Sequence, residues 1–287
     1  MVLVIGKNDR QYLLSHSACA AMTSRRFLQG RVALLTGSSD GLGFALAEAL
    51  AHSGCHVMLN GIEPSASVEV RRAALEQSTG VSVGYCEVSV AEESGVAALI
   101  EATRKRFGAL DILVNNAVVR HFAPIVNFPT EKWEAALAVN LSAAFHTIRM
   151  ALPGMRTGNF GRIFNMTSVY GSRGTTNRVD YVTTKAALLG LTRAVALENL
   201  DCDVTCHALC PGSVLTPGTE ARIRQLMAER KLSRAAAEQA FLAGKQPGGR
   251  FIPTASVSDL LLFLCGPAAR DMTGAQLPVE GGWLASG

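Results

Sequence analysis

Residues 31–54 read RVALLTGSSDGLGFALAEALAHSG, and this stretch decides the fold. Val32–Leu35 is a short apolar run without a helical period, as expected of a buried strand. Gly37, Gly41 and Gly43 then mark a tight turn, after which apolar residues resume at helical spacing. A strand, a glycine turn and a helix N-terminus form a cradle for a diphosphate, because free backbone amides and the helix dipole face the anion. The alternative is an ordinary tight turn between a strand and a helix.

Apolar runs alternate with helical patterns along the rest of the chain. The predicted strands are Val32–Leu35, His56–Leu59, Val81–Glu87, Ile112–Asn115, Gly161–Thr167, Val204–Cys210 and one near Gln276–Val279. The predicted helices include Gly43–Ser53, Ser89–Phe107, Glu131–Leu152, Asp180–Leu200 and Ala255–Cys265. This alternation implies right-handed crossovers. We therefore predict a single α/β domain with a doubly wound, mostly parallel seven-stranded sheet and helices on both faces.

A second signal lies in SVYGSRGTTNRVDYVTTK, which begins at Ser168. If the part after Arg178 is helical, Tyr181 and Lys185 lie one turn apart on the same face. The ammonium then favours the phenolate and lowers a tyrosine pKa that is otherwise near ~10. The hydroxyl of Ser168 comes from a separate segment and can hold the oxygen that exchanges the proton. Alone, a Tyr-x-x-x-Lys pattern is usually helix surface, but its place downstream of the glycine turn favours a catalytic role.

Further motifs complete the pattern of a known family. Asn115-Asn116-Ala117, Asn140 and Pro211-Gly212 stand with the segments above in the order of the short-chain dehydrogenase/reductase family, which the chain resembles from about Gly30 to Trp283. More locally it resembles the 3-hydroxybutyrate dehydrogenase branch, in the segments His121–Ile125, Asn140–His146, Ala151–Arg156, Lys245–Pro247 and Gly281–Ala285. The resemblance implies a Rossmann fold and an oxidoreductase that interconverts a secondary alcohol and a ketone, with a small hydroxy acid such as 3-hydroxybutyrate as substrate.

The resemblance also implies roles for four catalytic residues, Asn140, Ser168, Tyr181 and Lys185. The phenolate of Tyr181 takes the hydroxyl proton while hydride leaves for the nicotinamide. Lys185 lowers the tyrosine pKa and binds the nicotinamide ribose, and Ser168 orients the substrate oxygen. Asn140 is expected to hold a water for proton relay to Lys185. Taken singly, Asn140 could be a buried residue at a helix kink and Ser168 a strand-end cap.

NAD is the expected cofactor, with NADP less favoured. The residues that the resemblance assigns to it are Gly37, Ser39, Asp40, Gly41, Leu42, Gly43, Asn60, Glu87, Val88, Asn116, Ala117, Tyr181, Lys185, Pro211, Gly212, Val214 and Thr216. The acidic residue that usually grips the ribose diol is missing at the end of the second strand, where Asn60 is expected to bind the hydroxyls instead. No cation stands at the usual positions for a 2′-phosphate, and Asp40 is expected to repel one. Val118 replaces a glycine that the family usually has beside the cofactor.

The substrate site is expected to be anion-binding. The residues that the resemblance places there are Arg120, Ser168, Tyr170, Arg178, Gln246 and Trp283. Gln246 and Trp283 match the branch, whereas Arg120, Tyr170 and Arg178 replace a glutamine, a histidine and a lysine. Arg178 can bind a carboxylate through two parallel hydrogen bonds. The alternative is that both arginines extend into water.

Two rival functions remain open. An NADPH-dependent 3-oxoacyl thioester (acyl carrier protein) reductase has the same fold and catalytic residues, but needs a basic ribose-phosphate site, against which Asp40 counts. A non-catalytic dinucleotide sensor has no need of Ser168, Tyr181 and Lys185. Tyr181→Phe separates the cases, because it should abolish turnover and leave cofactor binding nearly intact.

Composition favours a soluble cytoplasmic enzyme. The chain has 287 residues, 48% of them hydrophobic, a net charge of +4 and no uninterrupted apolar stretch of membrane-spanning length. No basic run suggests nucleic acid, so neither nucleic acid nor a membrane is expected as a partner. Seven scattered cysteines argue against a disulfide framework. Cys202, Cys206 and Cys210 with His207 could suggest a metal, but the segment reads as a buried strand, and we expect no metal site.

The ends of the chain and one insertion complete the predicted organisation. Residues 1–28 stand outside the family pattern, and we expect a disordered extension before a catalytic domain over 29–287; a transit peptide or a true start at Met22 are the alternatives. The segment Pro217–Pro253 is expected to form two helices of a mobile substrate lid. Family relatives are commonly tetramers that pair the helices at 131–152 and 180–200, so a homotetramer is expected.

Overall fold

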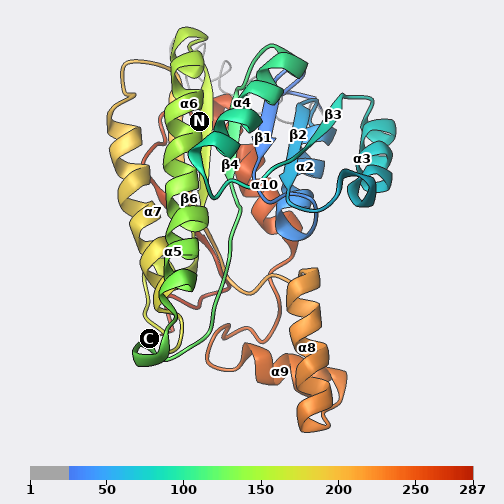
Figure 1. Cartoon of the computed structure of the whole chain (residues 1–287), viewed down its shortest axis with the longest axis vertical. Helices are drawn as coiled ribbons and strands as arrows, with labels where there is room; N and C mark the ends of the chain where they lie inside the picture. Colours follow the sequence, from blue (N-terminus) through green and yellow to red (C-terminus); the bar gives the residue numbers. More distant parts are fainter. Residues whose placement is uncertain (1–25, 287) are drawn as a thin grey trace, which may run out of the picture.

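The computed structural model of the chain describes residues 26–286, within which one sheet of seven parallel strands forms the centre (Figure 1). The strands are β1 Val32–Leu35, β2 His56–Gly61, β3 Val83–Glu87, β4 Ile112–Asn115, β5 Gly161–Met166, β6 Val204–Pro211 and β7 Gln276–Val279. Their order in the sheet is β3-β2-β1-β4-β5-β6-β7, and every neighbouring pair is parallel. The predicted α/β class and the seven-stranded doubly wound sheet are confirmed.

Helices alternate with these strands. They are α2 Gly41–His52, α3 Ser65–Thr79, α4 Glu93–Phe107, α5 Thr130–Leu137, α6 Ala143–Thr157, α7 Val179–Leu197, α8 Pro217–Arg230, α9 Arg234–Leu242 and α10 Thr254–Cys265. Sequence periodicity did not single out α3. Its only buried side chains are Val68, Leu75 and Thr79, so the apolar stripe that would indicate a helix is sparse.

The helix predicted over 131–152 is interrupted. Between α5 and α6 the backbone takes a π-helical turn over Ala138–Ser142. Such a turn widens a helix locally and is frequent at functional sites. It contains Asn140, whose side chain is buried, and the helical path then continues to Thr157 with Pro153 inside it. Hydrophobic periodicity cannot reveal this, because the π-turn shifts the pattern by a single residue.

The two faces of the sheet carry separate hydrophobic cores. Successive residues of β1 point in opposite directions, because side chains alternate along a strand. Ala33 and Leu35 pack with α2 and α10, whereas Leu34 packs with α4 and α6. All three side chains are fully buried. This two-sided burial explains why the parallel strands read as continuous apolar runs.

The continuous helical path Thr130–Thr157 is apolar enough for a membrane span by length and composition, with a mean hydropathy of 1.3. Asn140, His146 and Arg149 interrupt the path, so it is not the uninterrupted apolar stretch whose absence was expected. Ile148 and Ala151 of this path are buried in the core beside the sheet. About 39% of its most apolar window is buried, so the helix is a core element with a large remaining exposed face.

The chain joins the fold slightly before the predicted boundary at residue 29. Leu28 is buried in the core and its amide donates to the carbonyl of Ser53 at 3.0 Å. The predicted disordered extension otherwise lies outside the described residues. In the insertion predicted over Pro217–Pro253, α8 and α9 form the expected pair of helices and project beyond the sheet (Figure 1).

Candidate active site

A cavity of about 660 Å³ opens where the parallel strands end at their carboxyl termini. β1 lies between β2 and β4, and the connections from these strands leave in opposite directions. In open α/β sheets, ligands bind in the crevice at such a switch point. Gly37 after β1 and Asn116 after β4 both line the cavity, and Trp283 lines it from the C-terminal segment.

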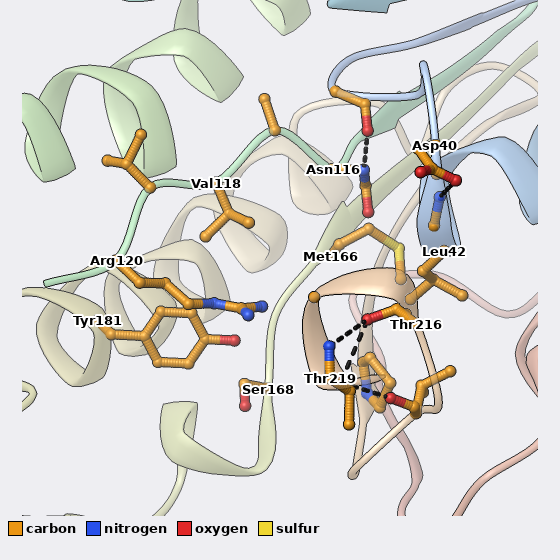
Figure 2. Close-up of a pocket in the computed structure, with 18 of the residues that line it drawn as sticks. Asp40, Leu42, Asn116, Val118, Arg120, Met166, Ser168, Tyr181, Thr216 and Thr219 are labelled. Carbon is orange, nitrogen blue, oxygen red and sulfur yellow. Dashed lines mark hydrogen bonds between the residues drawn. The ribbon is translucent and has the colours of Figure 1, made fainter. Parts of the chain in front are cut away.

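The glycine turn approaches the neighbouring loop closely. Gly37 has a φ of +57°, and a Cβ there would lie 2.7 Å from the Cα of Ala117. Asp40 is the N-cap of α2, and its carboxylate accepts a hydrogen bond from the amide of Gly41 at 2.7 Å (Figure 2). The first turn of α2 lines the cavity through Gly41, Leu42 and Gly43. A helix N-terminus at a side-chain-free turn fits a dinucleotide diphosphate.

Asn116 fastens this turn to β4. Its amide nitrogen donates to the carbonyl of Gly37 at 2.6 Å and to that of Thr36 at 3.2 Å. Val118, which replaces the usual glycine, faces the same cavity (Figure 2). The predicted cofactor residues that line the cavity are Gly37, Ser39, Asp40, Gly41, Leu42, Gly43, Asn60, Val88, Asn116, Ala117, Tyr181, Lys185, Pro211, Gly212, Val214 and Thr216.

Asn60 borders the cavity, but its side chain does not have the predicted role. The residue is 2% exposed, and its amide nitrogen donates to the carbonyls of Cys86 and Val88 at 3.1 and 2.9 Å. Its amide oxygen accepts from the amide of Gly37 at 3.3 Å. Both amide hydrogens are used by the backbone, so Asn60 holds β3 and the glycine turn in place and has no donor left for a ribose hydroxyl.

Glu63 brings a carboxylate to this end of the cavity, and the sequence reading missed it. A Cβ on Gly61 would collide with a carboxylate oxygen of Glu63 and lie 3.0 Å from the hydroxyl of Ser39. The carboxylate therefore occupies the space that a side chain at position 61 would fill, and both residues line the cavity. The hydroxyl of Tyr85 donates to the carbonyl of Glu63 at 2.7 Å and fixes this segment. The only signal in the sequence is an acidic residue just after β2.

Glu87 is a correction to the predicted cofactor site. Its carboxylate accepts hydrogen bonds from the amide and the hydroxyl of Ser65 at 2.7 and 2.9 Å. It therefore binds the first turn of α3, whose N-terminal amides need an acceptor. Glu87 does not line the cavity, whereas its neighbour Val88 does.

Tyr181 and Lys185 lie on α7 as predicted, and both are almost fully buried. The Lys185 ammonium donates to the carbonyl of Met166 at 2.6 Å and lies 5.6 Å from the centre of the Tyr181 ring. Burial lowers the pKa of Lys185 to about 8, against the opposing effect of the Tyr181 oxygen. Ser168 lies just after β5 and caps the short 3₁₀ helix Val169–Gly171. Its hydroxyl accepts a hydrogen bond from the amide of Tyr170 at 3.3 Å and also hydrogen-bonds Tyr181.

The net charge around Tyr181 favours its phenolate. Burial alone raises the pKa of Tyr181, but Arg120, then Lys185, the hydrogen bond from Ser168 and Arg178 outweigh it, so the pKa is lower than usual. Arg120 has the largest of these lowering effects. Its guanidinium carbon lies 5.2 Å from the centre of the Tyr181 ring, and Figure 2 shows the side chain beside that ring. A residue expected to bind substrate thus also activates the base.

Asn140 lies outside the cavity lining and holds the loop that carries Arg120. Its amide oxygen accepts from the amide of Val119 at 2.8 Å, and its amide nitrogen donates to the carbonyl of the same residue at 3.0 Å. A third contact reaches the hydroxyl of Thr184 at 3.4 Å. The predicted water relay to Lys185 stays a prediction; the bonds described here make Asn140 a positioning residue.

The end of the cavity away from the glycine turn is lined, as predicted, by Arg120, Tyr170, Arg178 and Trp283. The ring of Tyr170 contacts those of both Tyr181 and Trp283 edge to face, at 6.3 and 5.3 Å between centres. The guanidinium carbon of Arg178 lies 4.2 Å from the centre of the Tyr181 ring. These side chains surround the place where a substrate oxygen must meet Tyr181.

Gln246 is a third correction, after Asn60 and Glu87. It is buried, but its side-chain oxygen accepts from the amide of Ser213 and its nitrogen donates to the carbonyl of Arg250, so it braces the base of the lid. The cavity is lined instead by the preceding residue, Lys245, together with Phe241 of α9. The sequence therefore indicated the correct segment, but Lys245 and not Gln246 is the residue of that segment that lines the cavity. The choice depends on how the chain leaves α9, which periodicity does not encode.

The cysteine and histidine cluster of β6 is buried in the sheet. Cys206, His207 and Cys210 are all inaccessible to solvent. Burial lowers the pKa of His207 to about 4, so the imidazole is neutral. Among residues 26–286, no three His, Cys, Asp or Glu side chains are grouped closely enough to hold a metal ion.

Comparisons with known proteins agree with this geometry. Residues 31–226 match the short chain dehydrogenase family model. The D-beta-hydroxybutyrate dehydrogenases of Cupriavidus necator and Rhizobium meliloti are 36% and 37% identical over 258 residues, which cover 90% and 89% of this chain and 99% of each relative. L-Sorbose reductase from Gluconobacter frateurii, solved with NADPH and L-sorbose, superposes with a TM-score of 0.85 at 30% identity, over 89% of this chain and 97% of its own. The chain therefore belongs to the short-chain dehydrogenase family and is an oxidoreductase that acts on secondary alcohols with a nicotinamide cofactor.

Proposed function

We propose that the protein is an NAD-dependent dehydrogenase of a small hydroxy acid, which it converts reversibly to the oxo acid. The observation that carries this proposal is the pair of arginines beside the catalytic phenol. Arg120 and Arg178 both line the cavity, with guanidinium carbons 5.2 and 4.2 Å from the centre of the Tyr181 ring. A carboxylate next to the reacting hydroxyl is the group that such a pair recognises. Similarity to D-beta-hydroxybutyrate dehydrogenases at 36–37% identity supports the same substrate class.

The side chains of the site divide the proton chemistry between them. A nicotinamide held in this cavity would supply the hydride acceptor for the alcohol and the hydride donor for the ketone. Tyr181 takes the hydroxyl proton in oxidation and gives it back in reduction, because its lowered pKa makes the phenolate easier to form than in an ordinary tyrosine. The Ser168 hydroxyl hydrogen-bonds the phenol oxygen of Tyr181 and orients the substrate. Lys185 keeps a positive charge close to the Tyr181 ring.

The charges at the other end of the cavity support NAD rather than NADP. The carboxylates of Asp40 and Glu63 both line that end, where a 2′-phosphate would lie. Arg71, the nearby cation, forms an ion pair with Asp40 at 3.6 Å and donates to the carbonyl of Ser39. The carboxylate of Glu63 can accept hydrogen bonds from both ribose hydroxyls, whereas two carboxylates repel a phosphate. The free thiols of the six described cysteines suit the reducing cytoplasm, the proposed location.

The test is the initial rate of NAD reduction with D-3-hydroxybutyrate, measured by NADH absorbance. Tyr181→Phe should lower kcat by at least ~10²-fold and leave NADH binding intact, because only the proton-transfer group is lost. The same series includes NADPH with an acetoacetyl thioester and, as a neutral substrate, L-sorbose. A Tyr181-dependent rate on the thioester with NADPH, and none on hydroxy acids, would replace this proposal by the acyl thioester reductase.

A further inference from the structure

The substrate end of the cavity holds more positive charge than one carboxylate can balance. Arg178 comes from the start of α7 and Arg222 from the lid helix α8, and their guanidinium carbons each lie 4.9 Å from the centre of the Phe122 ring. The two guanidinium groups are therefore less than about 10 Å apart. Arg178 lines the cavity, whereas Arg222 and Phe122 lie beside it without lining it, so the aromatic ring brings two cations from distant segments to the edge of the site.

Lys245 adds a third charge from the end of the lid. Its ammonium lies 3.9 Å from the centre of the Phe241 ring, and both residues line the cavity. Burial lowers the pKa of Lys245, and so do the charges of Arg178 and Arg222. The three cations therefore lie close enough to repel one another, with Arg120 a fourth beside Tyr181.

Acidic side chains do not neutralise this cluster. None of the ion pairs among residues 26–286 includes Arg120, Arg178, Arg222 or Lys245. Burial lowers the pKa of Arg178, and Asp180 opposes this shift only weakly; the Asp180 carboxylate forms no ion pair with the described residues and accepts from the amide of His121 at 3.2 Å. The lining carboxylates, Asp40 and Glu63, border the cofactor end. Like charges at short range are unfavourable, so a ligand that brings several negative charges gains from this arrangement.

We propose that the physiological substrate is a hydroxy acid with a second anionic group, a carboxylate or a phosphate, beyond the carboxylate next to the reacting hydroxyl. This inference rests on the proposed dehydrogenase activity and refines its substrate class. Arg120 and Arg178 bind the carboxylate beside Tyr181, and Arg222 and Lys245 bind the second group under the lid. Because α8 and the segment just after α9 supply two of the four charges, the second anion draws the lid over the site.

The experiment compares kcat/KM for 3-hydroxyglutarate with that for its monomethyl ester, which has the same skeleton and one charge less. The wild-type enzyme should prefer the diacid about tenfold or more, a factor that corresponds to about 1.4 kcal/mol. Arg222→Met and Lys245→Met should each lower this ratio severalfold. Arg224→Met is the matched control, because Arg224 lies on the same helix, is 75% exposed and pairs with Glu220 at 3.1 Å; it should leave the ratio unchanged. 3-Hydroxy-4-phosphobutyrate, compared with D-3-hydroxybutyrate, distinguishes a phosphate from a second carboxylate.

Calorimetric binding to the NADH-loaded enzyme separates this inference from the proposed activity. Turnover of D-3-hydroxybutyrate with equal kcat/KM for diacid and ester would overturn the second anion site and leave the dehydrogenase proposal standing. Binding of 3-hydroxyglutarate that is weakened by Arg222→Met, without turnover of any hydroxy acid, would support the anion site and overturn the dehydrogenase proposal. Absence of binding and of preference for either dianion would overturn the inference outright.

Discussion

At the residue scale, the central question is how a buried tyrosine loses its proton. Tyr181 is only 6% exposed, and burial by itself opposes the phenolate. The cations around it reverse that effect, and Arg120 contributes more than Lys185. The pKa of the base therefore also depends on a residue outside the Tyr-x-x-x-Lys pattern, and in the proposed function the same side chain binds the substrate.

Arg120→Gln should move the pH profile of alcohol oxidation to higher pH. Oxidation requires the phenolate, so the rate rises as pH passes through the pKa of Tyr181. Arg120 lowers that pKa, and its removal raises it. The measurement is kcat against pH at saturating substrate, with Arg193→Gln on the exposed side of α7 as the control. An unchanged acid limb in Arg120→Gln would show that the guanidinium does not act on Tyr181.

Glu63→Gln should weaken the preference for NAD. In the proposed NAD site the carboxylate near Gly61 accepts from the ribose hydroxyls, and loss of a hydrogen bond to a charged group costs about 1.5–3 kcal/mol, or roughly tenfold or more in kcat/KM for NAD. Rates with NADP should rise relative to NAD, since one repulsive charge is removed. Glu69→Gln, on the exposed side of α3 and paired with Arg72, is the control. A constant NAD to NADP ratio would place the ribose elsewhere.

At the scale of elements, the end of β1 and the start of α2 have to approach β4 without side chains between them. A Cβ on Gly43 would lie 2.5 Å from both the amide nitrogen of Asn116 and the carbonyl oxygen of Gly37. Asn116 in turn holds the turn through its hydrogen bonds to Gly37 and Thr36. The glycine at position 43 is thus a packing requirement as well as a cofactor signal.

Gly43→Ala should destabilise the protein by about 1–3 kcal/mol, because the added methyl group forces the turn away from β4. The same displacement should weaken NADH binding. Chemical unfolding and NADH fluorescence titration measure the two effects. Gly248→Ala is the control, since a Cβ there meets no atom within 4 Å and the residue is exposed. Full stability and normal NADH affinity in Gly43→Ala would contradict the close packing described here.

At the scale of the whole molecule, one side remains more apolar than a monomer requires. The path Thr130–Thr157 keeps an exposed apolar face, and Phe145 on it is 47% exposed. Leu197 at the end of α7 and Leu200 just beyond it are 69% and 67% exposed. In Figure 1 these two long helices lie next to each other on one side of the sheet. Exposed apolar patches of this kind mark association surfaces, which supports the proposed homotetramer.

Light scattering should give a mass of four times the 30.3 kDa chain. Phe145→Glu should dissociate the tetramer, because a charge cannot be buried without a partner in an apolar interface. Val70→Glu, a similarly drastic change at a residue 81% exposed on α3, is the control and should remain tetrameric. A monomeric wild-type enzyme, or a Phe145→Glu tetramer, would remove these helices from the interface.

Local pattern was enough to predict the sheet, the glycine turn and the placement of Ser168, Tyr181 and Lys185. Each of these depends on neighbours a few residues away: alternation and burial make a strand, and i to i+4 spacing on a helix brings phenol and ammonium together. The roles of Asn60 and Glu87 were misread, because their hydrogen-bond partners come from other segments that only the folded chain brings near.

The tertiary structure alone decided which charges face the ligands. Glu63 reaches the cofactor end because Gly61 leaves space for its carboxylate, and Lys245 replaces Gln246 in the cavity because of the path the chain takes after α9. Arg222 meets Arg178 across the ring of Phe122, although the three come from different parts of the chain. Sequence patterns report local periodicity, whereas electrostatic fields add over all charges within a few ångströms regardless of their order along the chain. For this protein, sequence determined the fold and the reacting groups, and the packing of distant segments decided which charged side chains gather at the two ends of the cavity.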